Sequence, residues 1–181
     1  MTLEAFWKIL DEARCAVERT TDIPDWLVRY LKDRPLEDIV GFAECYHALC
    51  NRAYDALLWD AAEVMLGMCS DDKFTDFHGW LIAKGKEVYE NALKSPDSLS
   101  TVDGSDGDNG KASLFYMGSA ASKAYCERIG DELADLPIDF SSPVLSNEDA
   151  WDTDSAQRLA RLPNLCAKYR KPKTKDAHNT A

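Results

Sequence analysis

The sequence is short of basic residues. It has 21 Lys and Arg against 32 Asp and Glu, which gives a formal net charge of −11 over 181 residues. Five of the basic residues gather near the carboxyl end, and they are Lys168, Arg170, Lys171, Lys173 and Lys175. Residues 1–167 therefore carry 16 basic and 31 acidic side chains. Nucleic-acid backbones are bound by clustered Lys and Arg, so from this acidic body we expect no nucleic-acid partner. An acidic body would instead attract a basic protein at long range, although a well-solvated surface also explains the charge.

Long apolar runs and paired cysteines are also missing. No apolar run reaches about 18 residues, the length that spans a bilayer, so we expect no membrane partner. Residues 1–7 contain no basic stretch leading into an apolar one, and we therefore expect no export signal. The six cysteines form no C-x-x-C pair, which favours reduced thiols over disulfides. These features together predict a cytoplasmic protein.

No segment alternates apolar and polar residues in the manner of a half-buried strand. Apolar residues recur at helical spacing instead, bounded by Ser, Asp, Gly and Pro. The pattern predicts helices over about 3–19, 23–31, 35–66 with a kink near 54–55, 71–95 with an end or interruption at Gly85, 112–129 and 153–161. We therefore predict an all-α, single-domain bundle of six or seven helices over residues 1–170. A flexible Asp/Gly loop at 103–110 and a disordered basic tail at 171–181 complete the prediction.

Four blocks of the sequence carry a resemblance to a known family. The blocks are Phe6-Trp7-x-Ile9-Leu10-Asp11-Glu12, Ala53-Tyr54-x-x-Leu57-Leu58-Trp59-x-Ala61-Ala62, Cys69-Ser70-Asp71-Asp72-x-Phe74-x-Asp76-Phe77-x-x-Trp80-Leu81-Ile82-x-x-Gly85 and Asn91-Ala92-Leu93-x-x-Pro96-Asp97-x-Leu99. In this order they resemble a bacterial family known as domain of unknown function 4240, over about residues 1–135. The family has no assigned activity or catalytic residues. The resemblance therefore implies a fold and a compartment, and it implies no mechanism.

The third block contains the main candidate site. Asp72 and Asp76 are four residues apart on a predicted helix, so their carboxylates share a face and could bridge one divalent cation. Alternatively, Asp71 and Asp72 stabilise the start of that helix, by about 0.3–1 kcal/mol each. His78 follows closely, and we predict a candidate functional surface formed by Asp71, Asp72, Asp76 and His78. We expect no cofactor apart from this divalent cation.

Other constellations are incomplete. Glu44-x-x-His47 stands alone, whereas a di-iron bundle needs two such motifs and two further glutamates. Cys50 could add a soft ligand beside His47, but a zinc site would need partners from elsewhere. Pairing of Cys69 with His78, or of Cys50 with His47, would be needed for a thiol nucleophile. The loop at 103–110 does not match the ligand positions of a calcium-binding EF-hand in either register.

Two functions remain open from the sequence. The leading hypothesis is a non-catalytic, acidic helical module that binds a protein partner, possibly a basic one, in a regulatory or immunity-like role. The alternative is a small metal-assisted enzyme that uses Asp71, Asp72 and Asp76. The sequence predicts that Phe74, Phe77 and Trp80 pack into the core in either case.

Overall fold

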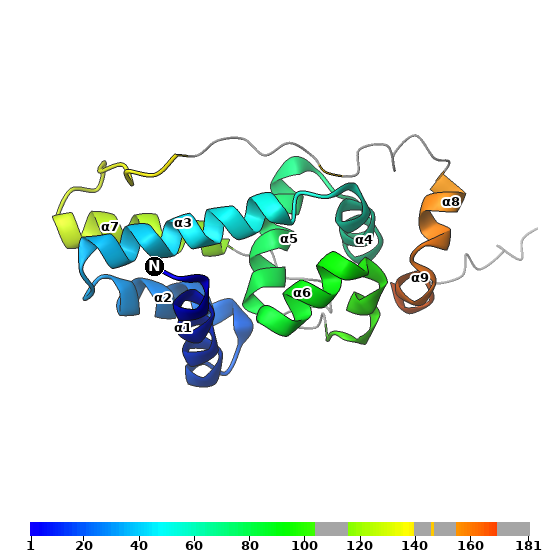
Figure 1. Ribbon diagram of the computed structural model, residues 1–181, viewed down its shortest axis with the longest axis horizontal. Helices are drawn as coiled ribbons and strands as arrows, with labels where there is room; N and C mark the ends of the chain where they lie inside the picture. Colours follow the sequence, from blue (N-terminus) through cyan, green and yellow to red (C-terminus); the bar gives the residue numbers. More distant parts are fainter. Residues whose placement is uncertain (104–115, 140–145, 147–154, 170–181) are drawn as a thin grey trace, which may run out of the picture.

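The computed structural model describes residues 1–103, 116–139, 146 and 155–169 (Figure 1). Within these ranges the chain forms α-helices and short 3-10 turns, and it forms no strand. The α-helices are α1 Leu3–Ala16, α2 Ile23–Leu31, α3 Leu36–Arg52, α4 Ala56–Leu66, α5 Asp71–Ala83, α6 Lys86–Lys94, α7 Ser119–Ile129, α8 Ser155–Ala160 and α9 Pro163–Tyr169. The 3-10 turns are η1 Thr20–Asp22, η2 Pro96–Thr101 and η3 Tyr116–Gly118. The predicted all-α architecture is confirmed.

The helices are more numerous than predicted because two long patterns divide. The pattern over 35–66 is interrupted at Asp55, whose carboxylate accepts hydrogen bonds from the N–H groups of Leu57 and Leu58 at 2.9 and 3.2 Å. Asp55 is thus the N-cap of α4, and the predicted kink is a complete break between α3 and α4. Gly67 ends α4 with φ +81°, in the left-handed conformation that glycine adopts without strain.

The second division falls at Gly85, between α5 and α6. Gly85 has φ +96°, and a Cβ at this position would collide with the guanidinium of Arg14. Arg14 Nη1 donates a hydrogen bond to the Lys84 carbonyl at 2.7 Å. Glycine is therefore required here by the backbone angle, and its lack of a side chain also leaves room for the Arg14 guanidinium.

The helices lie in an elongated arrangement along one axis (Figure 1). Helices α3 and α7 lie side by side and antiparallel in one half of the molecule, with α2 and α1 packed beside them. Helix α5 crosses the middle, where it packs against α3, α4, α6 and η3. The fully buried large side chains come from both halves and form one cluster, which includes Phe6, Leu10, Leu27, Phe42, Leu58, Phe74, Phe77, Trp80 and Tyr89.

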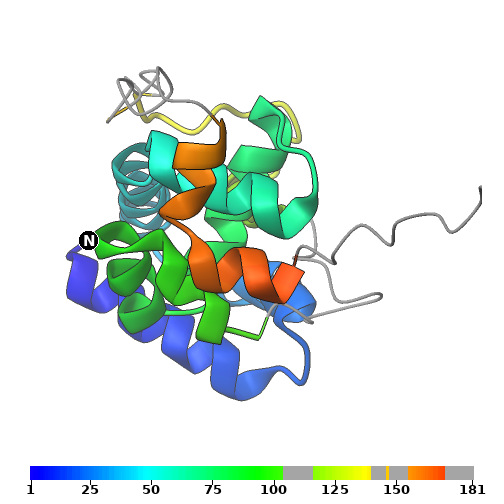
Figure 2. The same cartoon turned by 90° about the vertical axis from the view of Figure 1, so that its right-hand side faces the viewer.

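Helix α9 lies at the opposite end of the molecule from the carboxyl end of α7 (Figure 1). It packs against η2 and α4 (Figure 2). Asp97 of η2 accepts hydrogen bonds from the N–H groups of Asn164 and Leu165 at 3.0 and 2.9 Å. Lys168 donates to the Val102 carbonyl at 2.6 Å, at the other end of the same helix. These contacts hold a helix that the sequence pattern did not predict.

Several predictions fall partly or wholly on residues outside the described ranges. The loop at 103–110, apart from Asp103, and the tail at 171–181 belong to them. The helix predicted over 112–129 is described from η3 onward and ends as expected at Gly130, which has φ +79°. None of the described helices is long and apolar enough to cross a membrane.

Candidate functional site

The predicted aspartate cluster lies at the start of α5. Ser70 is the N-cap, and its hydroxyl accepts a hydrogen bond from the Lys73 N–H at 3.4 Å. Asp71 and Asp72 occupy the first helical turn and are exposed. Their carboxylates face the positive end of the helix dipole, so they stabilise the helix start as expected. This placement neither requires a metal ion nor prevents its binding.

Asp76 lies one turn after Asp72 and is partly buried. Burial raises the pKa of the Asp76 carboxyl, and the negative charge of Asp72 raises it further. The two carboxylates therefore repel each other, and a divalent cation bound between them would relieve this repulsion. Among the described residues, however, no group of three or more His, Cys, Asp or Glu side chains is arranged to hold a metal ion.

His78 is buried, with 3% of its surface exposed. Its Nε2 lies 3.1 Å from the Ala53 carbonyl, an acceptor, so the ring carries its proton on Nε2. The imidazole also packs against the ring of Phe74, with 4.2 Å between ring centroids. Burial lowers the pKa of His78 to about 4, against the smaller opposing effect of the hydrogen bond to Ala53.

The predicted placement of His78 on a functional surface is therefore wrong. The side chain faces the core because it lies on the same side of α5 as Phe74, and there it joins α5 to the carboxyl end of α3. Its role in the fold is structural. A neutral imidazole held by a backbone carbonyl cannot reach a substrate in solvent.

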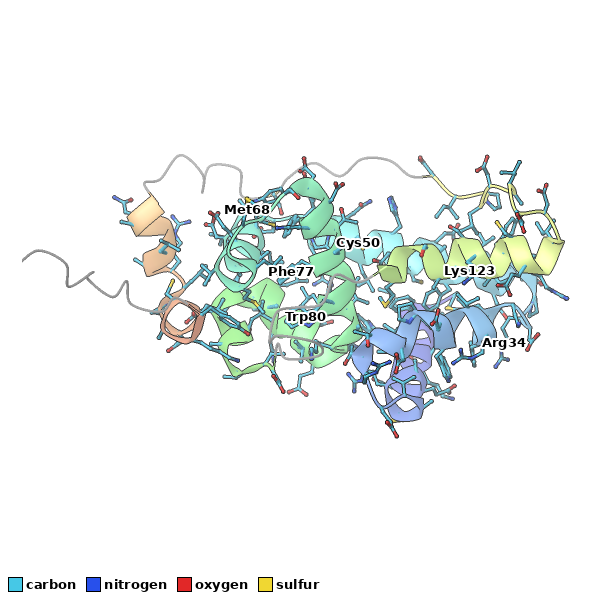
Figure 3. The ribbon with its side chains drawn as sticks, turned by 180° about the vertical axis from the view of Figure 1, so that it is seen from behind. Arg34, Cys50, Met68, Phe77, Trp80 and Lys123 are labelled. Atoms are coloured by element: carbon cyan, nitrogen blue, oxygen red, sulfur yellow. The ribbon has the colours of Figure 1, made fainter. Side chains whose placement is uncertain are left out.

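The aromatic residues of α5 are buried in the core, as the sequence predicted; Figure 3 labels two of them, Phe77 and Trp80. The ring centroids of Phe77 and Trp80 are 5.4 Å apart, and those of Phe74 and Phe77 are 6.1 Å apart. Trp59 of α4 meets Phe74 at 4.6 Å. Such aromatic contacts add to the hydrophobic gain from burial, so this part of the candidate run stabilises the core.

The thiols near the candidate histidines are not poised as nucleophiles. Cys50 shares a side-chain hydrogen bond with Tyr46, one turn earlier on α3, and burial raises the pKa of the Cys50 thiol to about 12. Burial likewise raises the pKa of Cys69 to about 12, with a further contribution from the charge of Glu63. Thiols with such pKa values carry almost no thiolate at neutral pH.

The Glu44-x-x-His47 motif belongs to no metal-binding group among the described residues. Glu44 is exposed on α3, and the Nδ1 atom of His47 lies 3.5 Å from the side-chain amide nitrogen of Asn51. A second buried polar residue, Asp60, was not singled out from the sequence. It is 2% exposed on α4, and its only sequence signal is a charge within the apolar run from Leu57 to Ala62.

The carboxyl end of α7 presents a surface that sequence reasoning missed. Helix α7 ends at Gly130, where the N–H groups of Gly130 and Asp131 both donate to the Cys126 carbonyl, at 2.8 and 3.3 Å. Residues 131–139 follow, and they contain four carboxylates and no basic side chain. The sequence pattern indicated only an irregular segment here. Its signal was an isolated leucine among acidic residues, directly after a glycine that ends a helix.

Residues 131–134 form a hydrogen-bonded turn. The Leu133 N–H donates to the Asp131 carboxylate at 3.0 Å, and the Ala134 N–H donates to the Asp131 carbonyl at 3.2 Å. The Cys126 thiol donates to the Ala134 carbonyl at 3.3 Å, and Leu136 is buried just beyond the turn. The turn is thus fixed at both ends, yet the Leu133 side chain is 88% exposed.

An open hollow of about 490 Å³ lies beside this turn. Its walls come from α7 and from the start of the turn, and they consist of Lys123, Cys126, Glu127, Gly130, Asp131 and Glu132 (Figure 3 labels Lys123). Three of these residues are acidic and one is basic. The hollow also lies at the negative end of the α7 dipole, which favours a positively charged group.

These features define an all-helical domain with a buried structural histidine at its centre and an acidic, partly apolar surface at one end. Comparison with known protein families gives a match to "Protein of unknown function (DUF4240)" over residues 1–127. The chain belongs to this family. Searches of the curated proteins and of the solved structures gave no match to this chain.

Proposed function

We propose that this chain is a cytoplasmic, non-catalytic module of a bacterial cell that binds a protein partner in a regulatory or immunity-like role. The observation that carries the proposal is the presence of large apolar side chains in solvent on an acidic domain. The most exposed of these side chains among the described residues is Leu133, at 88%. Burial of such a side chain in an interface contributes about 1.5–3 kcal/mol, which is available only when a partner is bound.

The charge of the domain favours a basic partner. The formal net charge is −11, so long-range attraction would raise the rate at which a basic protein meets this surface. The same charge opposes nucleic acids and anionic membrane surfaces. Neither is a partner in this proposal.

Affinity capture with quantitative mass spectrometry tests the proposal. The full chain, tagged and expressed in the cells that naturally make it, is compared with a tag-only control at about 0.15 M and about 0.5 M salt. We expect one or a few basic proteins to be enriched at the lower salt and reduced at the higher one. Absence of any enriched protein at the lower salt would contradict a binding function.

A second candidate function is metal-assisted chemistry at the start of α5. The specific observation is the position of Asp72 and Asp76 one turn apart on α5: burial, and then the charge of Asp72, raise the pKa of Asp76, and a bound divalent cation would relieve the repulsion between the two carboxylates. Under this alternative, millimolar Mg²⁺ or Mn²⁺ would raise the melting temperature of the chain, and Asp72→Asn would abolish the increase. Asp103→Asn serves as a control, because Asp103 is an exposed aspartate outside α5. An equal response of all three proteins, or no response, removes the metal-assisted candidate.

A further inference from the structure

We infer that the carboxyl end of α7 and the turn at 131–134 form the docking surface, and that its occupant is a basic segment of a partner protein bearing an apolar cleft. The inference rests on the proposed function and locates it. We call this surface the α7 end, and it comprises Lys123, Cys126, Glu127, Gly130, Asp131, Glu132 and Leu133. Two different features of the α7 end, one apolar and one charged, define the chemistry of the occupant.

The apolar feature is the fixed projection of Leu133. A leucine in a mobile loop would lose conformational entropy on binding, which reduces the affinity. Here the backbone on both sides of Leu133 is already hydrogen-bonded, through Asp131 and through the contact of Ala134 with Cys126. The side chain is therefore presented before the partner arrives, and an apolar cleft of matching size would gain its burial at little cost.

The charged feature is the hollow next to Leu133. Glu127, Asp131 and Glu132 contribute carboxylates to it, and the end of the α7 dipole adds partial negative charge. Lys123 lines the same hollow, and Lys32 of α2 forms an ion pair with Glu127 at 3.7 Å. Arg128 is exposed nearby on α7.

In the sequence that follows Leu133, Asp135 and Asp139 add two further carboxylates, with no basic residue between them. An arginine or lysine of the partner would enter the hollow while its apolar cleft receives Leu133. Charge complementarity thus selects a basic segment. A second copy of this chain would bring like charges together at the same place, which opposes association.

Site-specific photo-crosslinking of the full chain tests the location. Leu133 is replaced by p-benzoylphenylalanine, and Met68 and Leu3 are replaced in separate control proteins, because both are exposed apolar residues on other parts of the surface. Figure 3 shows Met68 in the other half of the molecule from Lys123. The three proteins are irradiated in the native cells, and the crosslinked peptides are sequenced.

We expect an adduct from position 133 whose partner peptide has a net positive charge, with little or none from the control positions. Adducts from position 68 or 3 alone would overturn the inference while leaving the proposed function intact. An adduct of position 133 with a neutral or acidic peptide, with nucleic acid or with a second copy of this chain would also overturn it. Absence of adducts at all three positions, together with failed affinity capture, would contradict the proposed function itself.

Charge-neutralising variants test the hollow separately. Asp131→Asn combined with Glu132→Gln keeps the size of both side chains, and the asparagine can still accept the hydrogen bond from Leu133. We expect this variant to retain about a third or less of the captured partner and to show a weaker dependence on salt. The matched control, Asp71→Asn combined with Asp72→Asn, removes the same charge at the start of α5 and should capture as much partner as the wild type. Equal losses in both variants would show that only overall charge matters and would overturn the inference.

Discussion

The region around His78 buries a polar side chain, whereas the region around Leu133 exposes an apolar one. At the centre of the molecule a titratable histidine is 3% exposed and bonded to the carbonyl at the end of α3. At the end of α7 an apolar leucine is 88% exposed on a turn that is held by hydrogen bonds. His78, which the sequence placed on a functional surface, belongs to the core. Leu133, an apolar residue in a segment that the sequence predicted only as irregular, belongs to the surface.

The difference shows that residue type alone does not locate a site. A buried polar group is tolerated when its hydrogen bond is made, and then it adds to the rigidity of the core. An apolar group that stays in solvent on a fixed backbone contributes nothing to the fold. The central region should therefore be sensitive to substitution in stability measurements, and the α7 end should be sensitive only in binding measurements.

The largest effect is expected from Phe74→Ala. The Phe74 ring is fully buried and contacts Trp59 and His78, so its removal leaves a cavity in the central region. We expect a loss of about 3–5 kcal/mol in the free energy of unfolding, measured with urea. Leu133→Ala should change the same quantity by less than about 0.5 kcal/mol. Comparable losses from the two substitutions would remove the contrast between the regions.

Gly85→Ala should have the next largest effect. The backbone would be strained at φ +96° and ψ 168°, a region that is almost restricted to glycine, and the new methyl group would push the Arg14 guanidinium away from the Lys84 carbonyl. Together we expect a cost of about 2–4 kcal/mol in unfolding free energy. Gly67→Ala is the matched control, since Gly67 also has a positive φ but no atom lies within 4 Å of the place that its Cβ would occupy. It should cost only about 1 kcal/mol, the backbone contribution alone.

Acidification should lower the free energy of unfolding because His78 is buried. In the unfolded chain His78 takes up its proton near pH 6.5, but in the folded chain it does so only near pH 4. Between these values the unfolded state binds more protons, so stability falls as the pH falls, by about 3 kcal/mol in all. About 2 kcal/mol of this loss should occur between pH 7.5 and pH 5.

The control for that prediction is His78→Gln, which retains a hydrogen-bond donor but does not titrate. Urea unfolding of both proteins at the two pH values separates this contribution from those of the other groups. The wild type should lose more stability than the variant on acidification. Parallel losses would mean that His78 is accessible to protons in the folded chain.

A smaller effect is expected at Asp76. This residue is partly buried, so its exposure is intermediate between that of His78 and that of Leu133. Its raised pKa means that the folded state disfavours the ionised carboxylate. The cost is therefore present at neutral pH and disappears as the pH falls through the raised pKa. Asp76→Asn should raise the melting temperature slightly at pH 7 and leave it unchanged at pH 3. A lower melting temperature at pH 7 would indicate that a favourable partner of Asp76 had been lost.

The sequence predicted those elements whose signals are local. Ser70 with two following aspartates indicated a helix start, and Gly67 and Gly130 indicated helix ends, because caps depend on neighbouring residues. The spacing of Phe74, Phe77 and Trp80 indicated a buried face for the same reason. The helical class and the family follow from such local patterns.

The remaining features depend on contacts between distant segments. His78 is buried because Ala53 lies across from it, and α9 is capped by Asp97, far earlier in the chain. Neither contact has a signature in the spacing of nearby residues. The exposure of Leu133 depends likewise on how the turn is held, through bonds that the sequence pattern does not reveal. A candidate site drawn from residue types alone therefore combined exposed aspartates with a core histidine.

A joint measurement of stability and binding on Leu133→Asp tests the central claim most directly. The free energy of unfolding and the amount of captured partner are determined for the wild type, for this variant and for Met68→Asp. The account predicts that Leu133→Asp keeps the wild-type stability within about 0.5 kcal/mol and loses partner capture by about tenfold, while Met68→Asp retains both. Unchanged capture by Leu133→Asp, or a loss of stability large enough to explain the reduced capture, would contradict it.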